Sequence, residues 1–224
     1  MKFQAVLFDC DGVLVDSEPI TNNVLRTMLI EQGWDISAQE CFVTFVGHSV
    51  ADRAALIAQR TGKSVTQPWL QQFRDRRDTA LREQLIAVPH IHFAVGALHR
   101  ATQGRIACAS GADRGKLMLQ LTKVDLLPYF EGRLFSGMEH ARNKPHPDVY
   151  LSAAKALATD PQHCAVVEDT PNGTRAGVAA GCTVWGYAPQ GDGAALLQAG
   201  AHHVFESMAD LPGALGLDGA RIQA

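Results

Sequence analysis

The chain has 224 residues, of which 46% are hydrophobic and 19% are charged, and its formal net charge at pH 7 is −3. This composition is typical of a globular protein with a sizeable core, arranged as one large domain or two smaller ones. Because the charge is slightly negative and no long basic run occurs, nucleic acid is not the expected partner.

Short apolar segments alternate with helical patterns along most of the chain. The apolar segments are residues 3–8, 105–110, 133–137, 164–169 and 182–187. The helical patterns among them are residues 116–124, 148–158 and 171–180. Continuous apolar runs of this length favour strands buried on both faces, so the alternation predicts an α/β fold with a doubly wound, mainly parallel sheet.

The alternation fails between the first two apolar segments. Residues 17–85 contain helical patterns and no convincing strand. We therefore predict a core domain of residues 1–16 plus 86–224 and an inserted α-helical cap domain of residues 17–85. The chain would return to the core at Val88-Pro89, and His90 and His92 are interpreted as surface or linker residues.

Polar residues follow the expected strands at the point where each strand ends. They are Asp9, Asp11, Ser110, Gly111, Glu168 and Asp169, and a loop after the third apolar segment adds Lys144. In an open α/β sheet, ligands bind beyond the carboxyl ends of the strands. Two acidic ends, one hydroxyl end and one lysine are therefore expected to converge on one crevice.

Each of these residues also has a purely local explanation. Asp11-Gly12 between apolar runs is a hairpin signal, and Ser110 fits the N-cap of a capping box. Lys144 suits a solvated loop, and Pro171 suits the first turn of a helix. These local roles do not explain why all the polar residues fall at the same end of the sheet.

Phosphoryl transfer through an aspartyl phosphate is the chemistry that needs this set. One carboxylate attacks as nucleophile, and clustered carboxylates require a cation, for which hard oxygen ligands favour Mg²⁺. A hydroxyl, backbone N–H groups and a lysine bind the phosphoryl oxygens. A second carboxyl group protonates the leaving alkoxide and then activates water.

Four segments in order, "DCDGVLVDS", "ASG", "NKPHPDVY" and "VVEDTPNGTRAG", resemble the motifs of the haloacid dehalogenase superfamily. The similarity spans nearly the whole chain and is greatest to the β-phosphoglucomutase-like branch, which contains many sugar-phosphate phosphatases. The resemblance implies a Rossmann-like core with a helical cap, and Mg²⁺ as cofactor.

Matched by position, the resemblance assigns a role to each motif residue. Asp9 becomes the nucleophile and a metal ligand, and Asp11 becomes the general acid/base, with its backbone carbonyl on the metal. Asp169 becomes a direct metal ligand, and Glu168 lies near the metal or acts through its water. The residues expected to bind phosphate or substrate are Ser110, Gly111 and Lys144, with Gly47 and His48 in the cap. The Lys144-Pro145 bond is a candidate cis peptide.

The expected function is a Mg²⁺-dependent phosphatase that hydrolyses a small phosphate monoester, such as a sugar phosphate or sugar-acid phosphate. A β-phosphoglucomutase-type mutase is the main alternative, although this chain has Thr21 and Val50 where mutases of the branch resemble one another in carrying histidine and arginine. A non-enzymatic phospho-aspartate receiver switch is the third reading, and such domains are much shorter and lack a cap.

Cysteine usage and hydropathy indicate the cellular location to expect for the protein. The five cysteines are scattered and lack CxxC spacing, which favours a reduced cytoplasmic protein. No signal-peptide pattern or membrane-spanning apolar run is present, so no membrane partner is expected. A monomer is expected for a capped enzyme of this size.

Overall fold

The computed structural model describes residues 3–45, 49–191 and 193–217. The chain forms two compact units. The first, called the core unit here, comprises Met1–Asp16 and Ile86–Ala224, and the second, called the insert unit, comprises Ser17–Leu85. Each unit is described by itself below.

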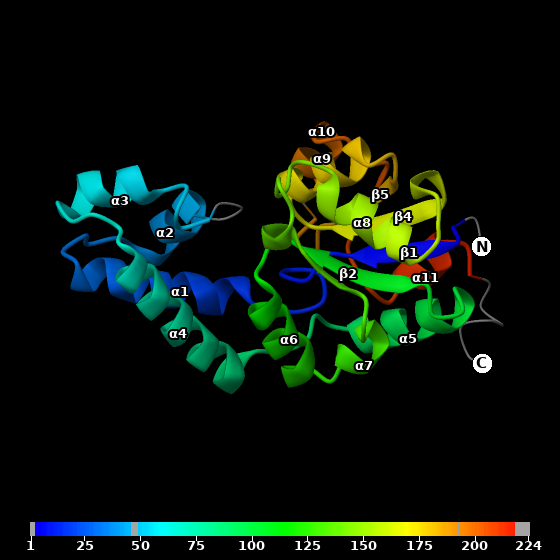
Figure 1. Ribbon diagram of the computed structural model, residues 1–224, viewed down its shortest axis with the longest axis horizontal. Coiled ribbons are helices and arrows are strands. Elements are labelled where there is room, and N and C mark those ends of the chain that lie inside the picture. The colour runs from blue at the N-terminus through cyan, green and yellow to red at the C-terminus, as the bar shows by residue number, and fades with distance from the viewer. Residues whose placement is uncertain (1–2, 46–48, 192, 218–224) are drawn as a thin grey trace. The chain divides into compact units, whose positions relative to one another are not determined.

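The core unit is built on one six-stranded sheet (Figure 1). Its strands are β1 (Ala5–Phe8), β2 (Ile106–Ser110), β3 (Leu134–Ser136), β4 (Cys164–Glu168), β5 (Thr183–Tyr187) and β6 (His203–Phe205). They lie in the order β3-β2-β1-β4-β5-β6, and all five pairings are parallel. The predicted α/β class is confirmed, and each expected apolar segment contains a strand.

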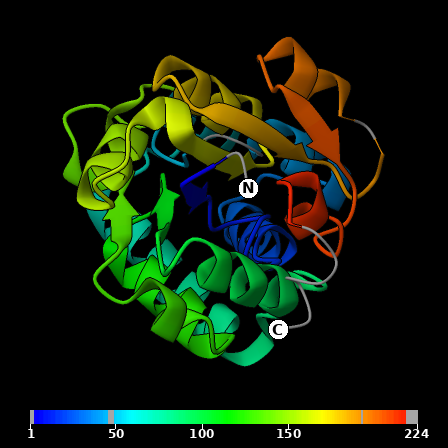
Figure 2. The same cartoon turned by 90° about the vertical axis from the view of Figure 1, so that its right-hand side faces the viewer.

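Helices cover both faces of this sheet (Figure 2). They are α5 (Ile91–Ala101), α6 (Arg114–Lys123), α7 (Leu127–Phe130), α8 (Asp148–Ala156), α9 (Pro171–Ala179), α10 (Ala194–Gln198) and α11 (Leu211–Ala214), with short 3₁₀ turns η1 (Gly137–Glu139) and η2 (Pro161–His163). Helices α8 and α9 lie on one face, and α5, α7 and α11 lie on the other. The sheet is therefore doubly wound, as the strand-helix alternation predicts.

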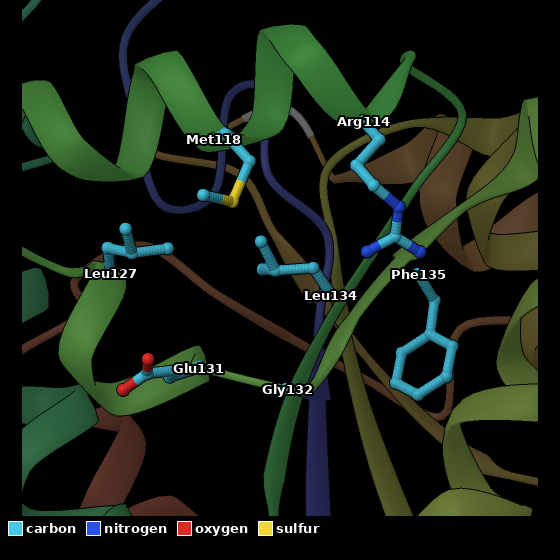
Figure 3. A pocket seen from close by; sticks show the side chains of 7 residues that line it. All are labelled: Arg114, Met118, Leu127, Glu131, Gly132, Leu134 and Phe135. Carbon is cyan, nitrogen blue, oxygen red and sulfur yellow. The ribbon is translucent and has the colours of Figure 1, made fainter.

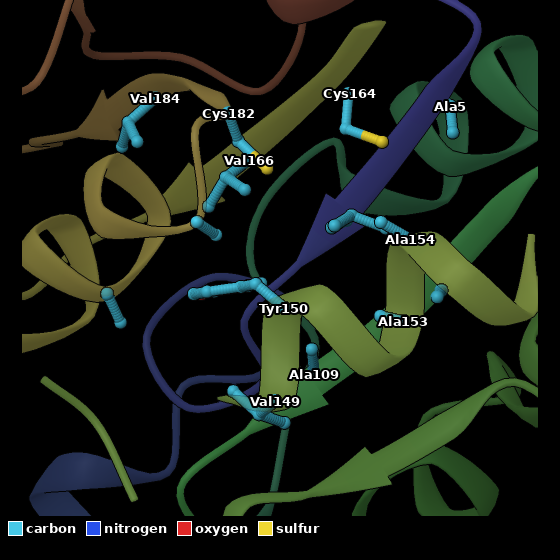
Figure 4. Packing of buried hydrophobic residues seen from close by; sticks show 14 of the residues in the cluster. Ala5, Ala109, Val149, Tyr150, Ala153, Ala154, Cys164, Val166, Cys182 and Val184 are labelled. Atoms are coloured by element: carbon cyan, nitrogen blue, oxygen red, sulfur yellow. The ribbon is translucent and has the colours of Figure 1, made fainter. Parts of the chain in front are cut away.

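The alternation of side chains along β1 decides which helix each residue faces. Ala5 and Leu7 belong to the buried cluster that includes Tyr150 of α8 (Figure 4). Phe8 points the other way and meets the ring of Phe130 in α7 edge-on, with 6.0 Å between centroids. Beyond the strand, the same alternation directs Asp9 towards the α8 side of the sheet.

The insert unit is helical, with α1 (Glu18–Glu31), α2 (Ala38–Phe45), α3 (Ala54–Thr61) and α4 (Gln67–Gln84). Its buried cluster includes Leu29, Ile36 and Ile57, and Val50 packs against it. Helix α2 was not among the helical patterns expected from the sequence. In the described part of the chain, no helix has the length and apolar character needed to cross a membrane.

The return to the core differs from the expected linker. His90 has a positive φ of 65° and is the N-cap of α5, so His92 lies in a helix rather than a linker. Both histidines are exposed, as expected. Helix α5 forms because Ile91, Ala94, Val95 and Leu98 repeat with helical spacing and are buried on one face.

Candidate active site

Three carboxylates meet at the carboxyl end of the sheet. Phe8 pairs with Val167, and the Asp9 N–H donates to the Val167 carbonyl over 3.0 Å, which places Asp9 level with Glu168. One carboxylate oxygen from each of Asp9, Glu168 and Asp169 lies within 4.8 Å of the other two. The acidic strand ends thus converge as the sequence predicts.

Lys144 bridges two of these carboxylates. Its Nζ lies 2.5 Å from Oδ1 of Asp9 and 2.7 Å from Oε1 of Glu168, and it also lies 4.8 Å from the centroid of the Tyr150 ring. Burial alone would lower the pKa of Lys144, but the charges of Asp9 and Glu168 raise it well above its usual value. Lys144 is therefore a fixed positive charge, and its bond to Pro145 is cis, which confirms the prediction.

The surroundings of Asp9 raise the pKa of its carboxyl group. Burial raises its pKa from 3.8 to about 7, against the opposing charge of Lys144, and the nearby negative charges of Glu168 and Asp11 add to the rise. A divalent cation beside Asp9 would favour the ionised, nucleophilic form.

Glu168 is fully buried and surrounded by donors. Its Oε1 accepts from Lys144 Nζ and from the Tyr150 hydroxyl, while Oε2 accepts from the backbone N–H groups of Asp169 and Thr170 and from the Thr170 hydroxyl. A carboxylate offers about four lone-pair positions, so these contacts saturate it. A β-carbon on Gly173 would overlap the Glu168 carboxyl group, so glycine is required where α9 passes it.

The Asp11 carboxylate accepts hydrogen bonds from two side chains of helix α6. Both of its carboxylate oxygens lie 2.8 Å from Lys116 Nζ, and Oδ1 also accepts from Gln120 Nε2 over 2.7 Å. The sequence offered a signal for these two partners, because Lys116 and Gln120 are spaced i, i+4 in the helix that follows the second strand. Their role was not predicted.

The loop that carries Asp11 is a compact turn closed by an isolated bridge between Asp11 and Val15, rather than a hairpin between two strands of the sheet. Strand β1 pairs with β2 and β4, while Val15 bridges to Ala87. Gly12 has a φ of 76°, and its N–H donates to the Val15 carbonyl over 2.8 Å. A β-carbon on Gly12 would overlap the carboxyl group of Asp169, so the turn and the acidic cluster are in close contact.

The second strand contributes Ser110 and Gly111 to the same end of the sheet. Asn143 connects them to the lysine loop: its Nδ2 donates to the Gly111 carbonyl over 2.9 Å, and its Oδ1 accepts from the Lys144 N–H over 2.8 Å. Ser110 is not the N-cap of α6, because Asp113 accepts the capping hydrogen bond instead. The Ser110 hydroxyl instead accepts from the Ala112 N–H over 3.2 Å, in the turn that precedes the helix.

The remaining expectations fall outside this cluster. Gly47 and His48 lie outside the described residues. Pro171 lies in the first turn of α9, as predicted, and Thr170 is the N-cap of that helix. Tyr150 is the last residue of the segment "NKPHPDVY", but no role was predicted for it. Its hydrogen bond to Glu168 is seen only in the structure. Cys10 is fully buried.

A separate hollow of about 320 Å³ lies on the flank of the core unit (Figure 3). It is lined by Arg114, Met118, Leu127, Glu131, Gly132, Leu134 and Phe135. None of the clustered carboxylates lines it, so it is not the candidate active site.

Comparison with known proteins adds to this geometry. A family model described as a haloacid dehalogenase-like hydrolase matches residues 3–181. The 6-phosphogluconate phosphatase of Escherichia coli (strain K12) is 30% identical over 185 residues, 82% of each chain, and hexitol phosphatase B of that strain is 30% identical over 184 residues, 79% of each. A solved HAD family hydrolase from Deinococcus radiodurans R1, with bound phosphate and sodium, is 34% identical, with a TM-score of 0.79 over 96% of this chain and 95% of its own.

Proposed function

The chain belongs to the haloacid dehalogenase-like hydrolases and is an enzyme of the phosphoric monoester hydrolase class, and from this premise we propose its reaction. It hydrolyses a small sugar phosphate or sugar-acid phosphate, with Mg²⁺ as cofactor and an aspartyl phosphate, the acyl phosphate of Asp9, as intermediate. The observation that carries the proposal is the buried Asp9 carboxylate between Lys144 and the acidic residues at the end of β4.

The donor set of the site fits Mg²⁺. Asp9, Glu168 and Asp169 each bring a carboxylate oxygen within 4.8 Å of the other two, and hard oxygen donors of this kind suit Mg²⁺. Because Glu168 is saturated by donors, we assign the ion to Asp9, Asp169 and the backbone carbonyl of Asp11, with Glu168 reaching it through water. When bound, Mg²⁺ shields the nucleophile from the anionic substrate and polarises the phosphoryl group.

In the first step, a carboxylate oxygen of Asp9 forms a bond to phosphorus while the bond to the leaving oxygen breaks. Asp11 gives its proton to that oxygen, and the alcohol departs. Lys144, the Ser110 hydroxyl and the Gly111 N–H bind the phosphoryl oxygens. In the second step, water attacks phosphorus, Asp11 accepts its proton, and Asp9 and inorganic phosphate are released.

The names of two relatives support the proposed substrate class. The two curated relatives are named for a sugar-acid phosphate and for hexitol phosphates, which supports a polar phosphate monoester here. The mutase alternative is less well supported, because Val50 packs against the apolar cluster of the insert unit and offers no charge. The cytoplasmic location and monomeric state stay predictions.

Phosphate release from a panel of sugar and sugar-acid phosphates, with and without Mg²⁺, tests the proposal. Asp9→Asn should lower turnover by at least about a thousandfold, because the nucleophile is lost. Asp16→Asn, which changes an exposed aspartate in the same segment, is the matched control. Wild-type turnover in Asp9→Asn would exclude the covalent route, and a single stoichiometric phosphorylation would indicate a switch.

A further inference from the structure

Helix α6 directs two buried polar side chains at the Asp11 carboxylate. Lys116 and Gln120 are 8% and 0% exposed, and they occupy the same face as the fully buried Leu117 and Leu121. Apolar side chains at these two positions would complete the buried face of the helix. Burying an ammonium group and an amide is costly unless each has good partners, so their common partner, Asp11, calls for an explanation.

The orientation of the Gln120 amide is fixed from its other side. The Cys10 thiol donates to Gln120 Oε1, with 3.4 Å between sulfur and oxygen. The amide nitrogen therefore faces Asp11, to which it donates over 2.7 Å. Cys10 immediately precedes Asp11, so one segment contributes both the carboxylate and the group that orients its donor.

Asp11 needs such support because of where it lies. It follows the end of β1, in the compact turn closed by Gly12 and Val15, so the sheet does not fix its side chain. Its side chain is 24% exposed, whereas that of Lys116 is 10% exposed. The two donors on α6 restrict the carboxylate to one position while leaving it accessible.

We propose that Lys116 and Gln120 are positioning residues for Asp11. They hold the acid/base carboxylate where the leaving oxygen of the substrate takes its proton, and they act through Asp11 rather than on the substrate itself. This inference rests on the proposed phosphatase function. It concerns proton transfer to the leaving group, and it predicts a dependence on the leaving group that a purely structural role would lack.

The test compares kcat/KM for two substrates, the best alkyl phosphate of the panel and p-nitrophenyl phosphate. Because kcat/KM covers the steps up to departure of the leaving group, it reports on help from an acid. An alkoxide needs that help, whereas p-nitrophenolate leaves without it. Lys116→Met and Gln120→Met should lower kcat/KM about 10- to 100-fold for the alkyl phosphate and less than about threefold for the aryl phosphate.

Two further variants complete the design. Lys123→Met removes an exposed lysine at the end of the same helix and should leave both substrates unaffected. Lys116→Arg keeps a cation that can donate to both carboxylate oxygens and should recover part of the alkyl-phosphate activity. Thermal unfolding of each variant shows whether it is folded at the assay temperature. If Lys116→Met is unfolded at that temperature, Gln120→Met alone tests the proposal.

Equal losses on the two substrates would overturn the inference and leave a structural role for α6. Unchanged or increased alkyl-phosphate activity would also overturn it, since Lys116 would then hold Asp11 in a resting position. Failure of the proposed function is recognised separately, because wild-type protein would then release no phosphate or Asp9→Asn would remain active.

Discussion

Tyr150 donates its hydroxyl hydrogen to Oε1 of Glu168 over 2.9 Å, and both side chains are fully buried. Burial, followed by the negative charge of Glu168, raises the pKa of Tyr150 well above its usual value, so the hydroxyl remains a donor. The same Oε1 contacts Lys144. Glu168 is thus an anchor that fixes the lysine beside the proposed nucleophile.

Replacing Tyr150 by phenylalanine tests this anchor. Loss of one hydrogen bond to a buried carboxylate should lower the free energy of unfolding by about 1–3 kcal/mol. Activity should fall less than about tenfold, because Lys144 and the backbone donors still hold Glu168 and the ring remains beside Lys144. Urea unfolding and phosphate release measure the two effects, with Tyr129→Phe in α7 as the control. A loss of activity without a loss of stability would contradict the anchoring role.

Gly12→Ala should weaken metal binding for a steric reason. Gly12 and Gly62 both have positive φ, 76° and 68°, so alanine at either position costs about 1–2 kcal/mol of backbone strain. A β-carbon at Gly12 would also overlap the Asp169 carboxyl group, whereas one at Gly62 would have no heavy atom within 4 Å.

Gly62→Ala is therefore a matched control for strain. The Mg²⁺ concentration for half-maximal activity should rise about tenfold or more in Gly12→Ala and stay unchanged in Gly62→Ala. Titration of phosphate release with Mg²⁺ measures both. Equal Mg²⁺ requirements in the two variants would show that the turn does not position Asp169.

The stability of the metal-free protein should depend on pH through Asp9. Its pKa is 3.8 in the unfolded reference and about 7 in the fold, so the native state binds the proton more tightly. Its contribution to the free energy of unfolding is therefore greatest below pH 4 and falls as the pH rises to about 7. Asp9→Asn should flatten this part of the profile.

Mg²⁺ should reverse that trend, because it binds the ionised carboxylates and must displace the Asp9 proton at low pH. The increase in melting temperature on adding Mg²⁺ should be larger at pH 8 than at pH 5. Melting curves at the two pH values, with EDTA as the blank, measure the difference. An equal increase at both values would mean that the ion does not compete with this proton.

The sheet and its acidic edge were predictable because local patterns specify them. Apolar runs marked the strands, and parallel strands bring Asp9 and Glu168 to one edge. Helix α5 was not predicted, because a proline followed by two polar histidines is typical of a linker, although Ile91 and the apolar residues after it have helical spacing.

The partners of the acidic residues were not predictable in the same way. Lys116 and Tyr150 reach their carboxylates across 105 and 18 residues of sequence, and no local pattern records such distances. Ser110 was a good capping candidate by sequence, yet Asp113 provides the cap, because the helix begins after a turn whose length the sequence does not fix.

The bridge between Val15 and Ala87 brings together the two points at which the chain leaves and re-enters the core unit. The Asp16 N–H also donates to the Ile86 carbonyl over 3.1 Å. Residues 17–85 therefore form a loop whose ends are already closed, and a short turn in their place would span neighbours only about 5 Å apart. The core unit is thus a candidate for expression as a shortened chain. In that chain, fewer residues would separate β1 from its partners β2 and β4 than in the full-length protein, which lowers the entropy cost of pairing them.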